Sequence, residues 1–175
     1  MKIQSIKTKR FVLRLVKKGD EFDIARNIND KTISRNTAAI PYPYKLKDAK
    51  DWVKKCLSRT RKKELTDIVF SIVIKKEVVG AVGLHDISYG HKAEIGYWLA
   101  KKHWGKGLAT EVAKEITKIC FNKLKLKRVT AKVYLPNKAS ARVLEKNGFK
   151  LEGILRRDSE KNGKLHDVYL YAKVR

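Results

Sequence analysis

A β-strand that leads through a glycine-rich turn into an amphipathic helix is the feature that most constrains the fold of this chain. Residues 93–99, AEIGYWL, have the composition of a buried strand, and glycines follow at positions 105 and 107. Apolar residues then recur from Leu108 onward at the spacing of one helix face. Neither element can bury its apolar side alone, so this unit requires a sheet with helices packed against it.

The rest of the chain supplies further strands and helices for that sheet. The prolines at 41 and 43 place residues 40–44 in a loop, and Gly148 ends the last helix. No stretch rich in Pro, Gly or Ser divides the sequence, so we expect a single domain over residues 1–175. The order of elements predicts an α+β fold, a mixed α/β sheet with helices on its faces. Strands are expected over 9–16, 68–74, 78–84, 128–135, 149–156 and 166–174, and helices over 20–30, 47–60 and 137–147.

Positive charge is the unusual part of the composition. The 175 residues include 42 Lys and Arg against 18 Asp and Glu, a formal net charge of +24. This excess favours attraction to RNA, a ribosomal surface, anionic lipid or a polyphosphorylated cofactor. Hydrophobic residues make up 43% of the chain, which excludes a wholly disordered protein.

Membrane, disulfide and metal chemistry have little support in the sequence. No apolar run approaches the roughly 18 residues of a membrane-spanning helix, and the basic N-terminal segment is too interrupted for a signal peptide. Cys56 and Cys120 fall on the inward faces of helices, where we expect core packing rather than a nucleophile. The four histidines show no ligand spacing. We expect a soluble, cytoplasmic protein with no metal and no membrane partner.

The turn before the helix at 108 has the features of a phosphate site. Gly105 and Gly107 let the backbone approach a ligand, and the first N–H groups of the helix point into the same space. Lys102 and Lys106 add positive charge. The Walker and Rossmann patterns both fail here, the latter because Thr110 replaces the third glycine. The alternative is an ordinary helix start with two turn glycines and solvated lysines.

Six blocks of the sequence resemble the GCN5-related N-acetyltransferases, in particular the ribosomal-protein N-terminal acetyltransferases of the RimJ/RimL branch. The segment HWGKGLATE is similar to the acyl-CoA loop of that family, with Lys102 where glutamine or arginine is usual. The resemblance implies the acetyltransferase fold, whose mostly antiparallel central sheet has a splayed strand pair. It also implies direct transfer of acetyl from acetyl-CoA to an amine in a ternary complex. The other blocks are TKRFVLR (8–14), PYPYKLKDAKDW (41–52), AEIGYWL (93–99), NKASARVLEKNGFKLEG (137–153) and DVYLYA (167–172).

The resemblance assigns roles to residues along the splayed strands. Glu94 matches a position that often carries the general base. Ser140 is a candidate hydrogen-bond donor to the departing thiolate, with Tyr134 and Tyr171 as weaker candidates. The alternative for Glu94 is a strand-end glutamate paired with a lysine. The alternative for Asn137, whose implied role is a contact to acetyl-CoA, is a simple helix N-cap. The implied acetyl-CoA contacts are Tyr97, Trp98, Leu99, Lys102, Gly105, Lys106, Gly107, Leu108, Ala109, Thr110, Asn137 and Ser140.

The acceptor amine is less constrained than the cofactor. Tyr42 and Tyr44, in the proline-flanked loop, are candidates to line the acceptor pocket. The alternative is that they are buried aromatics that hold the loop in place. His85 is a third candidate contact to the acceptor. The family branch favours a peptide N-terminal α-amine, and its relatives also include enzymes for polyamines and other small amines. The rival hypothesis is an inactive protein of the same fold that binds RNA or the ribosome through basic runs such as 54–63 and 123–128. The alternative explanation of these runs is that they form an ordinary solvated surface.

Overall fold

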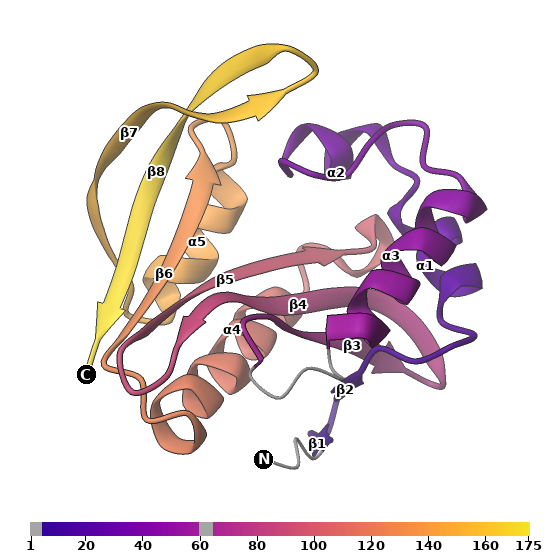
Figure 1. Ribbon diagram of the computed structural model, residues 1–175, viewed down its shortest axis with the longest axis horizontal. Coiled ribbons are helices and arrows are strands. Elements are labelled where there is room, and N and C mark those ends of the chain that lie inside the picture. The colour runs from indigo at the N-terminus through magenta and orange to yellow at the C-terminus, as the bar shows by residue number, and fades with distance from the viewer. Residues whose placement is uncertain (1–4, 60–64) are drawn as a thin grey trace.

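The computed structural model describes residues 5–59 and 65–175 and contains one eight-stranded sheet (Figure 1). The strands lie in the order β1-β2-β3-β4-β5-β6-β8-β7, and neighbours are antiparallel except for β5 and β6. The predicted α+β mixed sheet is therefore confirmed. The strands are β1 (Ile6–Lys7), β2 (Val12–Leu15), β3 (Ile68–Ile74), β4 (Glu77–Ser88), β5 (Lys92–Leu99), β6 (Arg128–Tyr134), β7 (Lys150–Lys161) and β8 (Lys164–Val174). The helices are α1 (Glu21–Ile28), α2 (Lys31–Arg35), α3 (Leu46–Arg59), α4 (Leu108–Lys118) and α5 (Lys138–Lys146).

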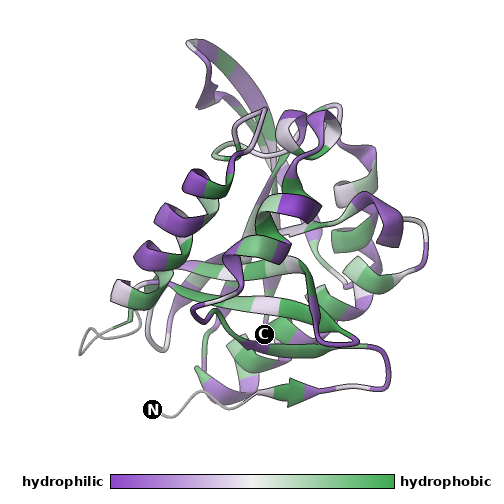
Figure 2. Cartoon of the chain, turned by 90° about the vertical axis from the view of Figure 1, so that its right-hand side faces the viewer, coloured by the Kyte–Doolittle hydropathy of each residue, from purple (hydrophilic) through white to green (hydrophobic). Residues whose placement is uncertain are grey.

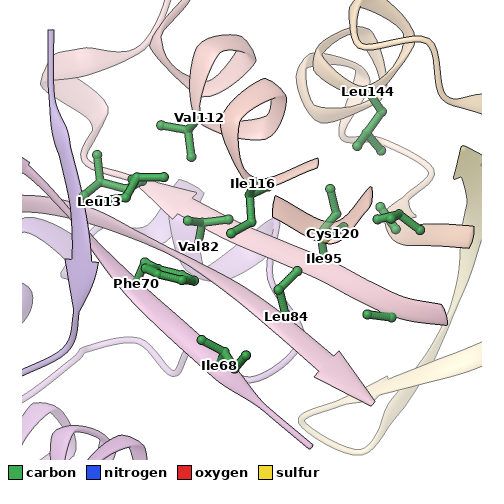
Figure 3. Close-up of a cluster of buried hydrophobic side chains, with 14 of the residues drawn as sticks. Leu13, Ile68, Phe70, Val82, Leu84, Ile95, Val112, Ile116, Cys120 and Leu144 are labelled. Atoms are coloured by element: carbon green, nitrogen blue, oxygen red, sulfur yellow. The ribbon is translucent and has the colours of Figure 1, made fainter. Parts of the chain in front are cut away.

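The sheet separates two hydrophobic cores. On one face α4 and α5 pack their apolar stripes on the strands, and Figure 3 shows Ile116 and Val112 of α4 beside Val82 and Ile95. On the other face α1 and α3 cover a second cluster that includes Trp98. Figure 2 shows mostly apolar strands between helices that are polar on the outside. Alternate residues of β5 therefore belong to different cores, with Ile95 in the first and Trp98 in the second.

The parallel pair β5 and β6 is joined only at its beginning. Three residue pairs connect the strands, from Lys92 with Arg128 to Glu94 with Thr130. Beyond these pairs β5 continues along β4 and β6 continues along β8, so the two strands diverge (Figure 1). This is the splayed strand pair implied by the resemblance.

Element boundaries differ from the sequence expectations where the pairing is long-range. The expected strand at 9–16 is shorter in the structure, β2 (Val12–Leu15). A further short strand, β1, precedes it across a turn in which the Thr8 N–H donates to the Phe11 carbonyl. Helix α2 was not expected; the Asp30 side chain caps it by accepting from the N–H groups of Thr32 and Ile33. Strands β7 and β8 extend further than expected, because the polar residues near Gly163 pair across a two-residue turn. The expected helix end at residue 60 lies outside the described residues, as does part of the basic run 54–63.

Both cysteines are buried and free, one in each core. Burial raises the pKa of the Cys56 thiol to about 11 and that of Cys120 to about 12. Neither side chain is a thiolate near neutral pH, in line with the expected core role. Within residues 5–59 and 65–175, no helix has the length and apolar character needed to cross a membrane.

The β3–β4 hairpin turns through two lysines in the left-handed region. Lys75 has φ +47° and Lys76 has φ +70°, a geometry that normally selects asparagine and glycine. We predict that Lys76→Gly stabilises the protein by about 0.5–1 kcal/mol, because glycine avoids the cost of a Cβ at positive φ. Urea unfolding measures the change. Lys76→Ala keeps the Cβ and should bring no gain, so equal effects of both variants would contradict this explanation.

Candidate active site

A cavity of about 830 Å³ occupies the opening between β5 and β6. Its walls come from the diverging strands, from the N-terminal ends of α4 and α5, and from α1 to α3. Because the two strands no longer pair here, backbone groups of both face the cavity rather than each other. The cavity therefore combines exposed main-chain hydrogen-bonding groups with two helix N-termini.

Along β5 the backbone N–H and C=O groups of successive residues point alternately toward β4 and toward the cavity. Ala100 donates to the Val79 carbonyl, and in the same antiparallel register Trp98 lies opposite Ala81 as a hydrogen-bonded pair. The backbone of Trp98 is thus directed at β4, so this implied acetyl-CoA contact has no free backbone group facing the cavity. The backbone of Tyr97 and Leu99 is directed at the cavity side, where the Leu99 carbonyl accepts from Nε1 of Trp104 at 2.7 Å.

The start of α4 forms a cradle of N–H groups. Gly107 is its N-cap residue at φ +73°, with no side-chain cap, and Gly105 has the same φ. A Cβ at either glycine would meet nothing within 4 Å, so glycine is needed for conformation and not for space. Both glycines and the first helical residues Leu108–Thr110 line the cavity. Uncapped N–H groups and the positive end of the helix dipole suit this position to a phosphate group.

The two lysines of the turn point elsewhere. Lys102 forms an ion pair with Glu77 at 2.8 Å, and this pairing holds the pKa of Glu77 down at about 2. Lys106 donates to the Lys102 carbonyl, and neither lysine is among the residues lining the cavity. The cations that do line it include Arg142 and Lys146 on α5. Sequence reasoning missed them, although their spacing of four residues places them on one helix face.

The start of α5 meets β5 across the opening. Asn137 caps the helix by accepting from the Ser140 N–H at 3.1 Å, so its expected capping role is present. The Ser140 hydroxyl lies 2.8 Å from the Tyr97 hydroxyl, and burial raises the pKa of Tyr97 to about 12. Both residues line the cavity. This pair offers a hydroxyl proton at the narrow side of the opening.

The two other tyrosine candidates differ in placement. Tyr134 lines the cavity and its hydroxyl lies 2.8 Å from the Ser159 hydroxyl. Tyr171 is buried in the α4–α5 core and donates to Glu145 at 2.8 Å. Burial and the nearby carboxylate raise the pKa of Tyr171 to about 12. Tyr171 is not among the lining residues, which leaves Tyr134 as the better placed of the two.

The acceptor candidates lie on the α1–α3 side of the sheet. Glu94 and His85 stand opposite each other on β5 and β4, and both line the cavity. Tyr44 is buried and lines it as well, whereas Tyr42 is 52% exposed and does not. The apolar wall includes Trp52 of α3, which the sequence analysis did not assign to the site.

Burial raises the pKa of the Glu94 carboxyl above its ordinary value, although the charges of Lys132 and His85 oppose the shift. No group of three or more His, Cys, Asp or Glu side chains that could hold a metal occurs in the described part of the chain. The site therefore offers a carboxylate with raised basicity, an imidazole, a hydroxyl pair and a phosphate cradle.

The comparisons with known proteins assign the family. The model of the acetyltransferase (GNAT) domain matches residues 10–150. The chain belongs to the GNAT acetyltransferase family. It is 40% identical over 101 residues to YoaA of Bacillus subtilis, described as an uncharacterized N-acetyltransferase, a match that covers 57% of each protein. It is 33% identical over 107 residues to the ribosomal-protein-serine acetyltransferase of Escherichia coli, covering 61% of this chain and 60% of that protein.

Solved structures show the same fold over nearly the whole chain. RimL, a ribosomal L7/L12 alpha-N-protein acetyltransferase in complex with coenzyme A, superposes with a TM-score of 0.86 at 21% identity and covers 98% of both chains. The chain therefore has the GNAT fold. The sequence matches span less than two thirds of YoaA and of the Escherichia coli protein.

The raised pKa of Glu94 has a consequence for stability. The folded protein holds this proton to a higher pH than the unfolded chain, so stability falls as pH rises from the ordinary glutamate pKa through the raised one. We predict that Glu94→Gln is more stable than the wild type at neutral pH and equally stable in acid below that window. Thermal unfolding at several pH values measures this. Glu160→Gln, at an exposed carboxylate, is the control, and an equal gain there would contradict the burial explanation.

Proposed function

We propose that this protein transfers the acetyl group of acetyl-CoA to the α-amine of a peptide N-terminus. The observation that carries the proposal is the open β5–β6 pair beside the uncapped α4 N-terminus, a phosphate cradle next to a free strand edge. The relative described as a ribosomal-protein-serine acetyltransferase supports a protein acceptor. Two buried free thiols are consistent with the reducing cytoplasm, where we place the protein.

The cofactor would use both helix N-termini. Its pyrophosphate would bind the N–H groups of residues 105–110, and Arg142 and Lys146 are the cations available near it. The amide-rich pantetheine arm would pair with the free backbone edge of Tyr97 and Leu99, as an added strand does. The thioester would then lie near the Tyr97–Ser140 hydroxyl pair.

The proposed chemistry is a direct attack of the amine on the thioester. An α-amine titrates at about 7.7–8.0, so it loses its proton near neutrality more easily than a lysine at about 10.4. Glu94, whose pKa is raised by burial, is the proposed general base. The Ser140–Tyr97 pair would give a proton to the departing thiolate. The developing oxyanion would be stabilised by a backbone N–H of β5.

The acceptor side favours an amine with an adjoining apolar group. Its wall is formed by apolar side chains of α1, α2 and α3. Arg59 and Lys132 also line this cavity, and two cations disfavour a polycation such as a polyamine. Because the Escherichia coli relative is described as a ribosomal-protein-serine acetyltransferase, a short peptide that begins with serine is the first acceptor to test.

Gly107 tests the cofactor site. We predict that Gly107→Val weakens acetyl-CoA binding about tenfold or more, because a β-branched residue is strained at φ +73° and would move the N–H cradle. Isothermal titration measures the affinity. Gly163→Val is the matched control, because Gly163 has the same φ and lies in the β7–β8 turn away from the cavity lining. Equal affinities of the two variants would refute the cradle.

Glu94 tests the chemistry. We predict that Glu94→Gln lowers kcat more than about tenfold and leaves acetyl-CoA affinity nearly unchanged, because the substitution removes a proton acceptor and not a cofactor contact. Turnover is measured as CoA thiol released with the Ser-peptide. Unchanged turnover would remove Glu94 from the role of general base.

A further inference from the structure

His85 is held in one orientation by a carboxylate. Its Nδ1 lies 2.9 Å from Oδ1 of Asp67, the residue before β3, and Nη1 of Arg59 lies 3.5 Å from the same oxygen. Burial raises the pKa of Asp67, but the hydrogen bond from His85 and the charge of Arg59 hold it below the ordinary value. Asp67 is therefore ionised and can only accept, so the neutral imidazole carries its proton on Nδ1. Nε2 is left as the basic nitrogen.

The position of Nε2 is fixed by two glycines that face each other. Gly83 on β4 lies opposite Gly96 on β5, and His85 stands two residues from Gly83 on the same face. The imidazole leans back over this pair, so that a Cβ on Gly83 would lie 2.5 Å from Nε2. Glycine at 83 is required for the ring to occupy this place.

The space above Gly96 is open except for this ring. Around the point where a Cβ of Gly96 would stand, the closest atoms from non-neighbouring described residues are Cδ2 and Nε2 of His85, each at 3.8 Å. Glu94 lies on the same face of β5, directly opposite His85. Tyr97 follows Gly96 at the free strand edge. A small group above Gly96 would thus lie between a basic nitrogen, a carboxylate and the proposed position of the thioester.

An amine that binds as an ammonium must lose two protons to become an amide nitrogen. The acceptor ammonium loses one proton before its lone pair attacks the thioester carbon and a second after the C–N bond forms. The C–S bond breaks with its electron pair on sulfur, and the thiolate takes up one proton. Each turnover therefore releases one net proton to solvent, and two protons must leave the same nitrogen.

We propose that His85 is a catalytic residue of this site, whose Nε2 accepts one of these protons from a nitrogen held above Gly96 while Glu94 accepts the other. Asp67 stabilises the resulting imidazolium, and the side chain of His85, 39% exposed, returns the proton to solvent. Gly83 acts as a positioning residue, because it leaves room for the imidazole. This role rests on the proposed acetyl transfer.

The first test compares His85→Ala with His91→Ala, an exposed histidine in the β4–β5 turn. We expect His85→Ala to lower kcat at least about tenfold with the Ser-peptide, with acetyl-CoA affinity unchanged, and His91→Ala to behave as the wild type. Imidazole added to the assay should restore part of the His85→Ala rate and leave the His91→Ala rate unchanged. Asp67→Asn should lower kcat in the same direction, because a neutral amide stabilises imidazolium less than a carboxylate.

The second test uses Gly83, the glycine over which the imidazole of His85 lies. Gly83→Ala should lower kcat, because its Cβ would displace the imidazole of His85. In the double variant with His85→Ala, the Gly83→Ala change should lower kcat no further, because no imidazole is left to displace. Gly153→Ala on β7, where a Cβ meets nothing within 4 Å, is the matched control.

The outcomes separate the two proposals. An active wild type with equal turnover in His85→Ala and His91→Ala overturns the role of His85 alone. A loss in His85→Ala that imidazole does not restore, with full activity in Gly83→Ala, also overturns it. A wild type that releases no CoA thiol with the peptide overturns the proposed acceptor, and the role of His85 with it.

Discussion

The early separation of β5 from β6 is the constraint on which the rest of the site depends. A strand that leaves its neighbour exposes N–H and C=O groups, and burying them without partners is costly. The structure meets part of this cost locally, because the Trp104 indole donates to the Leu99 carbonyl. Each diverging strand is also paired along its other edge, β5 with β4 and β6 with β8. The remaining free edge can be satisfied by a ligand with its own amides.

The opening also joins the two faces of the sheet. Along β5, Glu94 and Gly96 face the side of α1 and α3, whereas Tyr97 faces the side of α4 and α5. In a continuous sheet a base on one face and a hydroxyl donor on the other would be separated by the backbone. Because the strands part, the same cavity reaches Glu94 and Ser140. An attacking amine and a departing thiolate can thus be served from opposite faces of one strand.

The sequence predicted what depends on local periodicity and missed what depends on distant partners. The strand–turn–helix unit at Gly105 and Gly107 could be found because strand composition, turn glycines and helical spacing are all local. The partners of Lys102 and His85 could not, since Glu77 reaches Lys102 only through the pairing of β4 with β5, and Asp67 reaches His85 only through the pairing of β3 with β4. Charge and the family resemblance placed Lys102 in the predicted phosphate site, whereas the structure shows its ammonium group paired with Glu77. The backbone groups of Trp98 are directed at β4 and away from the cavity, and this too could be predicted only with the β4–β5 register in hand.

Some of the lysines that make up the excess of positive charge form hydrogen bonds within the fold. Lys161, near the tip of the β7–β8 hairpin, donates to the carbonyls of Ser34, Thr37 and Ile40 at 2.5, 2.6 and 2.8 Å, and its burial lowers the pKa of its ammonium group. It thereby fixes the loop after α2, a wall of the cavity, to a hairpin more than a hundred residues away. Lys173 similarly bonds the Asn147 carbonyl at the end of α5. Such cations donate to carbonyls at helix ends and in loops, so the net charge of +24 is not by itself evidence for a polyanionic partner.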